Sequence, residues 1–241
     1  MPTAPACTAP TPPSREELLG RIDADPLLAA LLGEVRSRTS GDGAHDLGHL
    51  LRVAGWTLAL AEESVSPTEA IVAALLHDLV NVPKSSAQRS EASAQSAAEA
   101  RRLLADRDVD PEAVERIAQA IIDHSFSRGA VPRSDLGRAL QDADRLEALG
   151  AIGVFRCAAT GAAMGTDFFD GDDPWAVHRE LDDRHHSVDH FFVKLLRLPA
   201  TMTTGAGRRE AHRRARFMAR FLRQLGEEIG SPPPVTRLAE D

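Results

Sequence analysis

The chain has 241 residues, of which 43% are hydrophobic, and this is enough for one large core or two small ones. Its formal net charge of −8 argues against a non-specific nucleic-acid binder, and its two cysteines, Cys7 and Cys157, are too few for a disulfide framework. No apolar run reaches the roughly 18 residues of a membrane span, and the first residues lack the pattern of a secretory signal, so we expect a cytoplasmic protein without a membrane partner.

Residues 1–13 are rich in proline, threonine and alanine, which predicts a disordered tail. Ser14 is the expected cap of a first helix, and a second helix is expected from Pro26 to about Arg38. Apolar periodicity then continues to residue 228 without a clear linker, which predicts one helical domain over residues 14–228 and a frayed tail over 229–241. No strand pattern is convincing, so the predicted fold class is all-α.

A helix is expected from about residue 44 to residue 63, because apolar residues recur at helical spacing between Leu47 and Leu58. His45 and His49 are four residues apart and therefore share one face of it. Both can ligate one metal, or one can ligate while the other faces a cleft. The same spacing also occurs in surface pairs near a helix N-terminus.

The next expected helix begins at Pro67 and carries an apolar run from Ala70 to Leu76 that ends in His77 and Asp78. A run of this kind buries itself, so it brings an imidazole and a carboxylate to a place where polar groups need partners. A divalent metal would satisfy both. A hydrogen-bonded core histidine beside a solvated aspartate is the commoner outcome for an isolated pair, so the rest of the chain has to decide.

Two later helices add candidates. One is expected to begin with Asp110 as cap and Pro111 as first residue, and it ends near His124, which is suited to a metal centre or to capping the helix C-terminus. The other is expected from Leu140 to Leu149. It carries Asp142 and Asp144, which point to opposite sides, so only one can face a site.

The segment from Pro174 to Leu198 contains four histidines, and His186, His190 and Lys194 follow one another at intervals of four. This spacing suits either a basic helical face that holds phosphate or an ordinary polar surface helix. The acidic loop 167–173 lacks the ligand spacing of a calcium hand. A last helix, from Arg208 to Leu225, has a basic face of the kind that is usually solvated.

His49, His77, Asp78 and one later aspartate together supply two imidazoles and two carboxylates. Such a set suits Mn²⁺, Mg²⁺, Fe²⁺, Ni²⁺ or Co²⁺ with positions left open for water. An open-site metal lowers the pKa of its water and supplies hydroxide near neutral pH.

The motifs that carry this set resemble those of the HD-domain metal-dependent phosphohydrolase superfamily, over roughly residues 44–200. They are His49-x-x-Arg52-Val53, Leu75-Leu76-His77-Asp78 and Ala143-Asp144-Arg145-Leu146. Two longer strings, Gln141 to Gly153 and Asp189-His190-Phe191 with Lys194-Leu195-Leu196, are similar to the bacterial subgroup typified by YedJ and YpgQ. The resemblance implies an HD-type helical bundle with additional C-terminal helices.

The resemblance also implies roles for individual residues. The metal ligands would be His49, His77, Asp78 and Asp144, with Asp144 preferred to Asp142 because the family's aspartate precedes a basic residue and leucine, and Asp78 would also orient the attacking water. The ion would be Mn²⁺ first, with Mg²⁺, Ni²⁺, Fe²⁺ or Co²⁺ as alternatives. Phosphate oxygens would be held by Lys84, Arg89, His124 and Arg145, and the grip would be extended by His190 and Lys194.

The chain departs from two branches of the superfamily. Some nucleoside monophosphatases carry a glutamate three residues after the HD aspartate, where this chain has Asn81, and cyclic-dinucleotide phosphodiesterases show His-Asp-Ile-Gly where it has Leu79 and Val80. The subgroup that the chain resembles includes an enzyme that splits nucleoside triphosphates to monophosphate and pyrophosphate. The resemblance therefore implies a metal-dependent phosphohydrolase acting on a nucleotide, with phosphoanhydride cleavage of a (deoxy)nucleoside triphosphate as its reaction. A homodimer is allowed and no nucleic-acid partner is expected.

Two alternatives stay open. One is a nucleotide-binding or regulatory HD protein with little turnover, which the absence of a glutamate at position 81 favours. The other is oxygenase chemistry at a di-iron site, for which His45 or His124 would supply the extra ligand.

Overall fold

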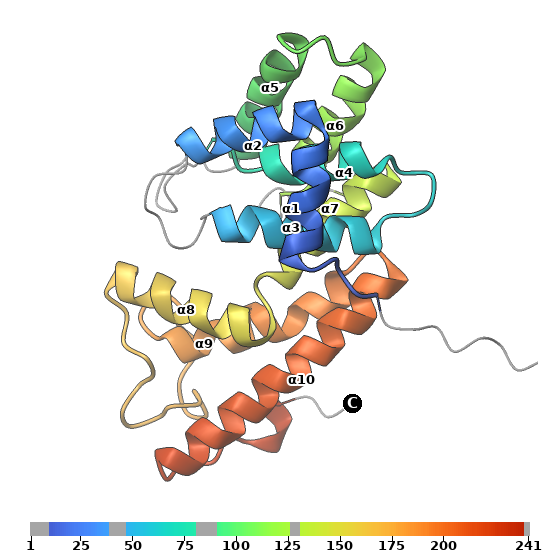
Figure 1. Cartoon of the computed structure of the whole chain (residues 1–241). Helices are drawn as coiled ribbons and strands as arrows, with labels where there is room; N and C mark the ends of the chain where they lie inside the picture. The colour runs from blue at the N-terminus through green and yellow to red at the C-terminus, as the bar shows by residue number, and fades with distance from the viewer. Residues whose placement is uncertain (1–9, 39–46, 81–90, 126–130, 239–241) are drawn as a thin grey trace, which may run out of the picture.

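The computed structural model describes residues 10–38, 47–80, 91–125 and 131–238 (Figure 1). In these ranges the chain is all-α, as predicted, and its only β-type pairing is an isolated bridge between Asp167 and His186. The helices are α1 (Arg15–Ala24), α2 (Pro26–Arg38), α3 (Leu47–Leu60), α4 (Pro67–Leu76), α5 (Ala92–Ala105), α6 (Pro111–Asp123), α7 (Asp135–Leu146), α8 (Gly150–Met164), α9 (Ser187–Val193) and α10 (Gly205–Glu228), with the 3-10 helices η3 (Leu195–Thr201) and η4 (Val235–Arg237).

Several helices begin where the chain carries local capping chemistry. Ser14 and Glu17 form a capping box at the start of α1, each side chain accepting from the other residue's backbone N–H. Asp110 accepts from Ala113 N, and Pro111 follows as the first residue of α6. These ends depend on neighbouring residues alone, which is why the sequence locates them.

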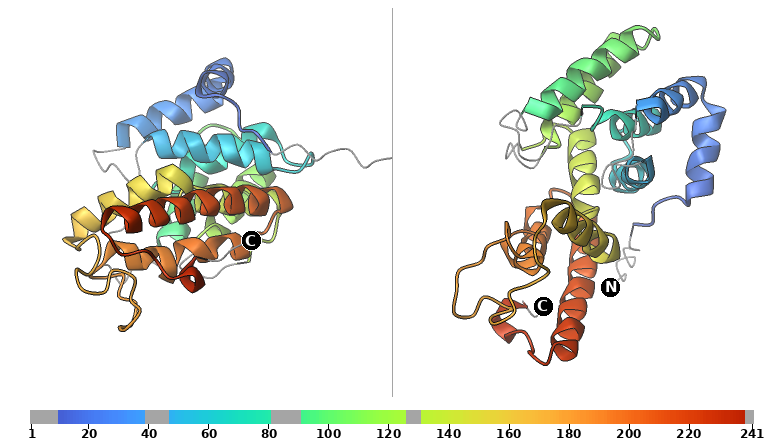
Figure 2. Two further views of the ribbon diagram at one scale, coloured as in Figure 1. Left: turned by 90° about the horizontal axis from the view of Figure 1, so that it is seen from below. Right: turned by 90° about the vertical axis from the view of Figure 1, so that its left-hand side faces the viewer.

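Helix α4 is the centre of the N-terminal part, where it contacts α2, α3, α5, α6 and α7 (Figures 1 and 2). Every residue from Ala70 to Leu76 is buried. A helix that is apolar on all sides is stable only with neighbours all round it. The C-terminal end of α4 therefore lies inside the bundle, and the residues that follow it start from a buried position.

The C-terminal part consists of α8, α9, η3 and α10, and it joins the bundle at α7. Helix α7 ends at Leu146, and α8 begins at Gly150, whose φ is 71°. The chain bends by 66° between these two helices. A left-handed φ is a conformation that glycine adopts without strain. Arg214 of α10 stacks over Trp56 of α3 and donates to the Leu146 carbonyl, and these contacts fix α10 against the bundle.

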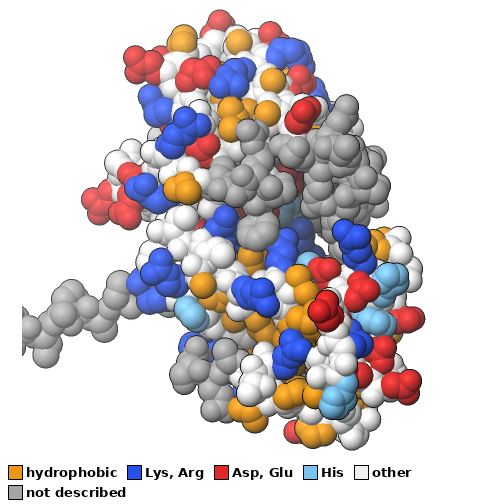
Figure 3. Space-filling model, turned by 180° about the vertical axis from the view of Figure 1, so that it is seen from behind, with side chains coloured by type: hydrophobic (Ala, Val, Ile, Leu, Met, Phe, Trp, Pro, Cys, Tyr) orange, Lys and Arg blue, Asp and Glu red, His pale blue; other side chains and the backbone are white. Residues whose placement is uncertain are grey.

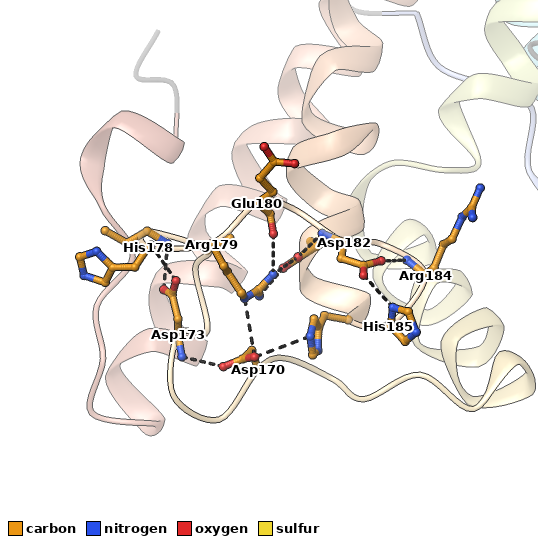
Figure 4. Close-up of polar contacts among 12 residues, drawn as sticks. Asp170, Asp173, His178, Arg179, Glu180, Asp182, Arg184 and His185 are labelled. Carbon is orange, nitrogen blue, oxygen red and sulfur yellow. Dashed lines mark hydrogen bonds and ion pairs between the residues drawn. The ribbon is translucent and has the colours of Figure 1, made fainter.

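The structure corrects the expected helix between Pro174 and Leu198. Only Ser187–Val193 is α-helical there, and His186 before it has an extended backbone. Most of the preceding segment is a loop (Figure 4). Its Arg179 pairs with the buried Asp189 of α9. His186, His190 and Lys194 therefore do not share one regular helical face.

The described residues after α10 make contacts with the rest of the chain. Trp175 donates its indole N–H to the Ser231 carbonyl at 2.7 Å, and Arg237 donates to the Ala176 carbonyl at 2.6 Å. Leu238 is only 2% exposed. Residues 231–238 thus pack against the 174–192 segment and α10.

No single helix in the described ranges is long and apolar enough to cross a membrane. The bent pair α7 and α8 passes the same test of length and composition when the two helices are taken together.

Candidate metal centre

Three histidines meet where α3, α4 and α6 come together beside α7. His49 lies in α3, whereas His77 and His124 are the C-terminal caps of α4 and α6. The imidazole rings are close, with centroids 5.4 Å apart for His49 and His77 and 4.9 Å apart for His77 and His124. The C-terminal ends of α4 and α6 bring the negative ends of two helix dipoles to this point, and these favour a cation.

Two carboxylates complete the group, which we call the His/Asp centre: His49, His77, Asp78, His124 and Asp144. Nε2 of His77 lies 3.4 Å from Asp78 Oδ2 and 3.9 Å from Asp144 Oδ1. Nε2 of His49 lies 3.7 Å from Asp144 Oδ1 and 3.9 Å from Asp78 Oδ2, and Nε2 of His124 lies 3.8 Å from Asp78 Oδ1. The structure thus brings together the four predicted ligands, and it adds His124 beside them.

Backbone carbonyls orient two of the three rings. Nδ1 of His77 lies 2.7 Å from the Ala74 carbonyl, and Nδ1 of His124 lies 2.6 Å from the Ile121 carbonyl. A carbonyl only accepts, so both Nδ1 atoms carry the proton in the neutral rings, and these bonds satisfy carbonyls left open at the helix ends. The lone pairs of Nε2 therefore face the carboxylates.

The donor set fits a divalent cation. Nε2 of His77 is buried and has no hydrogen-bond partner among the described residues. A buried polar nitrogen without a partner is costly, and a cation would satisfy it. Two subsets have ligand atoms all within 4.8 Å of one another, namely His49 with His77 and Asp144, and His77 with Asp78 and His124. Imidazoles and carboxylates together suit first-row divalent metals.

The ionisation of the centre reflects burial and mutual attraction. Burial opposes protonation of His77, but the carboxylates of Asp78 and Asp144 outweigh it and raise the pKa of His77 to about 9. Burial lowers the pKa values of His49 and His124. The pKa of Asp78 lies well below its usual value, since burial is outweighed by the neighbouring imidazoles. Metal-free, the centre holds a proton where a cation would bind.

Glu147 belongs to this site although the sequence analysis did not identify it. Its side chain is 1% exposed, its Oε2 lies 3.3 Å from Nδ1 of His49, and it accepts from Nε of Arg52 at 2.8 Å. Burial opposes ionisation of Glu147, but His49 and Arg52 outweigh it and lower its pKa. The available signal was its position three residues after Asp144, on the same face of the helix.

Asp142 lies on the other side of α7 from Asp144. It is fully buried and accepts from the backbone N–H and the hydroxyl of both Thr203 and Thr204, at 2.8–3.1 Å. Thr204 is the N-cap of α10. Asp142 therefore anchors α10, which explains why only Asp144 faces the centre.

The residues predicted to bind phosphate lie in different parts of the fold, and two of them are outside the described ranges. Arg145 is 8% exposed and donates to the Thr201 carbonyl, which links α7 to η3. His190 is half-buried, with Nδ1 2.8 Å from Asp183 Oδ2, and Lys194 follows α9. Lys84 and Arg89, like Asn81 and His45, lie outside the described residues. The space-filling view from behind shows Lys and Arg side chains gathered around a hollow near the middle of the molecule (Figure 3).

Comparison with known proteins agrees with this geometry. Residues 46–149 match the model of the HD domain family. Over 196 residues the chain is 33% identical to the protein YpgQ of Bacillus subtilis (strain 168), which covers 79% of this chain and 87% of that protein. The chain belongs to the HD domain family. The resemblance found in the sequence motifs, including that to the YpgQ-like subgroup, is thereby confirmed.

Solved structures of HD proteins support the assignment. The crystal structure of Bacillus subtilis YpgQ in complex with ADP has a TM-score of 0.64 and 28% identity, and the match covers 83% of this chain and 97% of that one. An HD-superfamily hydrolase from Bacillus thuringiensis has a TM-score of 0.63 and 29% identity, covering 88% and 98%. The chain thus has the fold of HD-superfamily hydrolases, and this family suggests metal-dependent hydrolase activity.

Proposed function

We propose that the protein is a metal-dependent phosphohydrolase that acts on a nucleotide, with phosphoanhydride cleavage of a (deoxy)nucleoside triphosphate as its reaction. The observation that carries the proposal is the convergence of ligand atoms from His49, His77, Asp78 and Asp144, with Nε2 of His77 buried and lacking a hydrogen-bond partner in the described chain. The YpgQ structure with ADP supports a nucleotide as substrate class.

In this proposal His49, His77, Asp78 and Asp144 hold the ion, with Mn²⁺ as the first candidate. When bound, such an ion lowers the pKa of a coordinated water and offsets charge on phosphate oxygens. In the proposal Asp78 also orients the attacking water. Its Oδ1 lies 3.8 Å from Nε2 of His124, and its Oδ2 lies 3.4 Å from Nε2 of His77 and 3.9 Å from Nε2 of His49.

His124 is the described residue best placed to contact a phosphate near the ion. It is buried, and its Nε2 is 3.8 Å from Asp78. In the neutral ring Nδ1 carries the proton, so Nε2 can only accept a hydrogen bond, for example from a protonated phosphate oxygen. Once Nε2 is itself protonated, it can donate to a phosphate oxygen. Contacts from Lys84, Arg89, Arg145, His190 and Lys194 remain predictions of the same proposal.

The test is a panel of nucleoside mono-, di- and triphosphates with Mn²⁺, scored separately for phosphate and pyrophosphate. Wild-type protein should release one of them, and Asp78→Asn and His77→Gln should each reduce turnover by a factor of at least about 1,000. His185→Ala is the matched control, since this histidine is 75% exposed and lies outside the centre. Full activity of the Asp78→Asn/His77→Gln double variant would refute the proposal, and tight nucleotide binding without turnover would favour the regulatory alternative.

A further inference from the structure

Nδ1 of His49 lies between a hydrogen-bond acceptor and a hydrogen-bond donor. Glu147 Oε2, at the end of α7, is 3.3 Å from this nitrogen, and Arg156 Nη1, from α8, is 3.2 Å from it. A neutral imidazole nitrogen either carries a proton or offers a lone pair, so it cannot bond to both neighbours at once. The choice between them sets the tautomer of His49.

The two tautomers have opposite consequences at the other nitrogen. If Nδ1 donates to Glu147, then Nε2 keeps its lone pair toward Asp144 and Asp78, 3.7 and 3.9 Å away. If Arg156 donates to Nδ1, the proton lies on Nε2, and this nitrogen cannot bind a cation. His77 and His124 differ from His49, because within the described residues the Nδ1 of each lies against a backbone carbonyl, which only accepts.

We propose that Glu147 is a positioning residue that selects the Nδ1–H tautomer of His49 against the donor Arg156, and thereby makes His49 a metal ligand. The inference rests on the proposed function, because it takes His49 as a ligand. A carboxylate that fixes the far nitrogen of a metal-binding histidine typically contributes a factor of 10–100 to metal affinity.

The surroundings of Glu147 suit this role. Its side chain is 1% exposed, and Oε2 accepts from both Nε and Nη2 of Arg52 at 2.8 Å. Arg52 thus holds the carboxylate in place and offsets its charge. Glu147 also follows Asp144 by one helical turn, so one end of α7 supplies a ligand and orients a second ligand.

The experiment compares Glu147→Leu with the double variant Glu147→Leu/Arg156→Leu. Mn²⁺ affinity is measured by competition with a chromophoric chelator, and the His49 tautomer of the metal-free protein is read from ¹⁵N shifts of labelled histidine. Glu147→Leu should weaken Mn²⁺ binding by about 10–100-fold and move the His49 proton to Nε2. The double variant should regain much of the affinity, because the competing donor is gone, and Glu147→Gln should stay within a few-fold of wild type.

Two controls separate the possible failures. Glu210 is also buried, at 4% exposure, and is paired with Arg213 and Arg214, so Glu210→Leu reports the effect of losing a buried glutamate elsewhere. It should leave Mn²⁺ affinity unchanged. If Glu147→Leu retains wild-type affinity while His49→Ala loses it, the tautomer inference falls and the proposed site stands. If His49→Ala binds Mn²⁺ as wild type does, the proposed ligand set falls. A double variant that binds no better than Glu147→Leu would show a merely structural role.

Discussion

Asp142 and Asp144 are two residues apart on α7, and replacing each by asparagine should have opposite effects. Asp142→Asn should destabilise the protein and change the intrinsic metal affinity far less than Asp144→Asn does. Asp144→Asn should abolish tight metal binding, and at pH 9.5, where His77 is largely neutral, it should leave the metal-free protein almost as stable as wild type. The reason is that Asp142 accepts four hydrogen bonds at the start of α10, whereas Asp144 faces the His/Asp centre.

The magnitude follows from what the asparagine amide does to this anchor. Its carbonyl oxygen replaces one carboxylate oxygen, while its NH₂ group meets the N–H of either Thr203 or Thr204, so two of the four bonds are lost. Each lost bond to a charged acceptor costs about 1.5–3 kcal/mol, and the loss is partly relieved by relaxation, so we expect about 2–4 kcal/mol. For a chain of this size that corresponds to a fall in Tm of roughly 5–15 °C.

The assay is thermal unfolding of the metal-free proteins, followed by Mn²⁺ titration well below Tm. At pH 9.5 Asp144→Asn should shift Tm by less than about 3 °C, and near pH 7 it should lower Mn²⁺ affinity by at least about 100-fold. If Asp142→Asn were as stable as wild type, the anchoring role would be wrong. If it lost metal binding as completely as Asp144→Asn, the two aspartates would not have the separate roles that their contacts indicate.

Three further predictions concern titration and packing. The pKa of His77 is raised to about 9 from an unfolded value of about 6.5, so its proton stabilises the metal-free protein fully below pH 6.5. This contribution, up to about 3 kcal/mol, is lost as pH rises through 9. Urea unfolding at pH 6.5 and 9.5 measures it, and an unchanged midpoint would contradict it. Mn²⁺ must displace the same proton, so its affinity should rise by nearly tenfold per pH unit up to about pH 9, which calorimetry in two buffers would detect as proton release. Arg179→Leu leaves the fully buried Asp189 without its charged partner and should cost about 3–5 kcal/mol, part of which Arg179→Leu/Asp189→Leu should recover.

The helices could be predicted where local chemistry defines them. Ser14 and Pro111 mark starts that the structure has, and the apolar run from Ala70 to Leu76 is the buried helix α4. These features depend on residues within one or two turns of the chain. The all-α class followed from the same periodicity.

The segment before α9 could not be predicted, because distant contacts decide it. Histidines at intervals of four suggested a helix, yet Arg179 reaches Asp189 ten residues later, and Asp189 also accepts from Asp182 N. Spacing alone does not say which aspartate an arginine pairs with. The same holds for Trp175, which takes the Ser231 carbonyl as partner and thereby keeps the chain after α10 packed.

The sequence predicted four residues that the structure brings together, but it did not predict Glu147, which contacts one of them. His77 and Asp78 stand out because they end an apolar run, and His49 and Asp144 are motif residues at the expected intervals. Glu147 is an ordinary surface-type residue in sequence. Its burial depends on His49 and Arg52, which lie 98 and 95 residues away in the chain, so only the fold brings out its position.

Helix α7 explains how the C-terminal helices bear on the centre. Asp144 and Glu147 are three residues apart and lie on one side of α7, whereas Asp142 is about 200° around the helix from Asp144. One side therefore meets the imidazoles, and the other is tied to the N-terminus of α10 by Thr203 and Thr204. A rotation of α7 that withdrew Asp144 from His49 would also pull Asp142 from its four donors. The anchor of α10 thus fixes the orientation of α7 about its axis, and with it the positions of a ligand and of the residue that orients another.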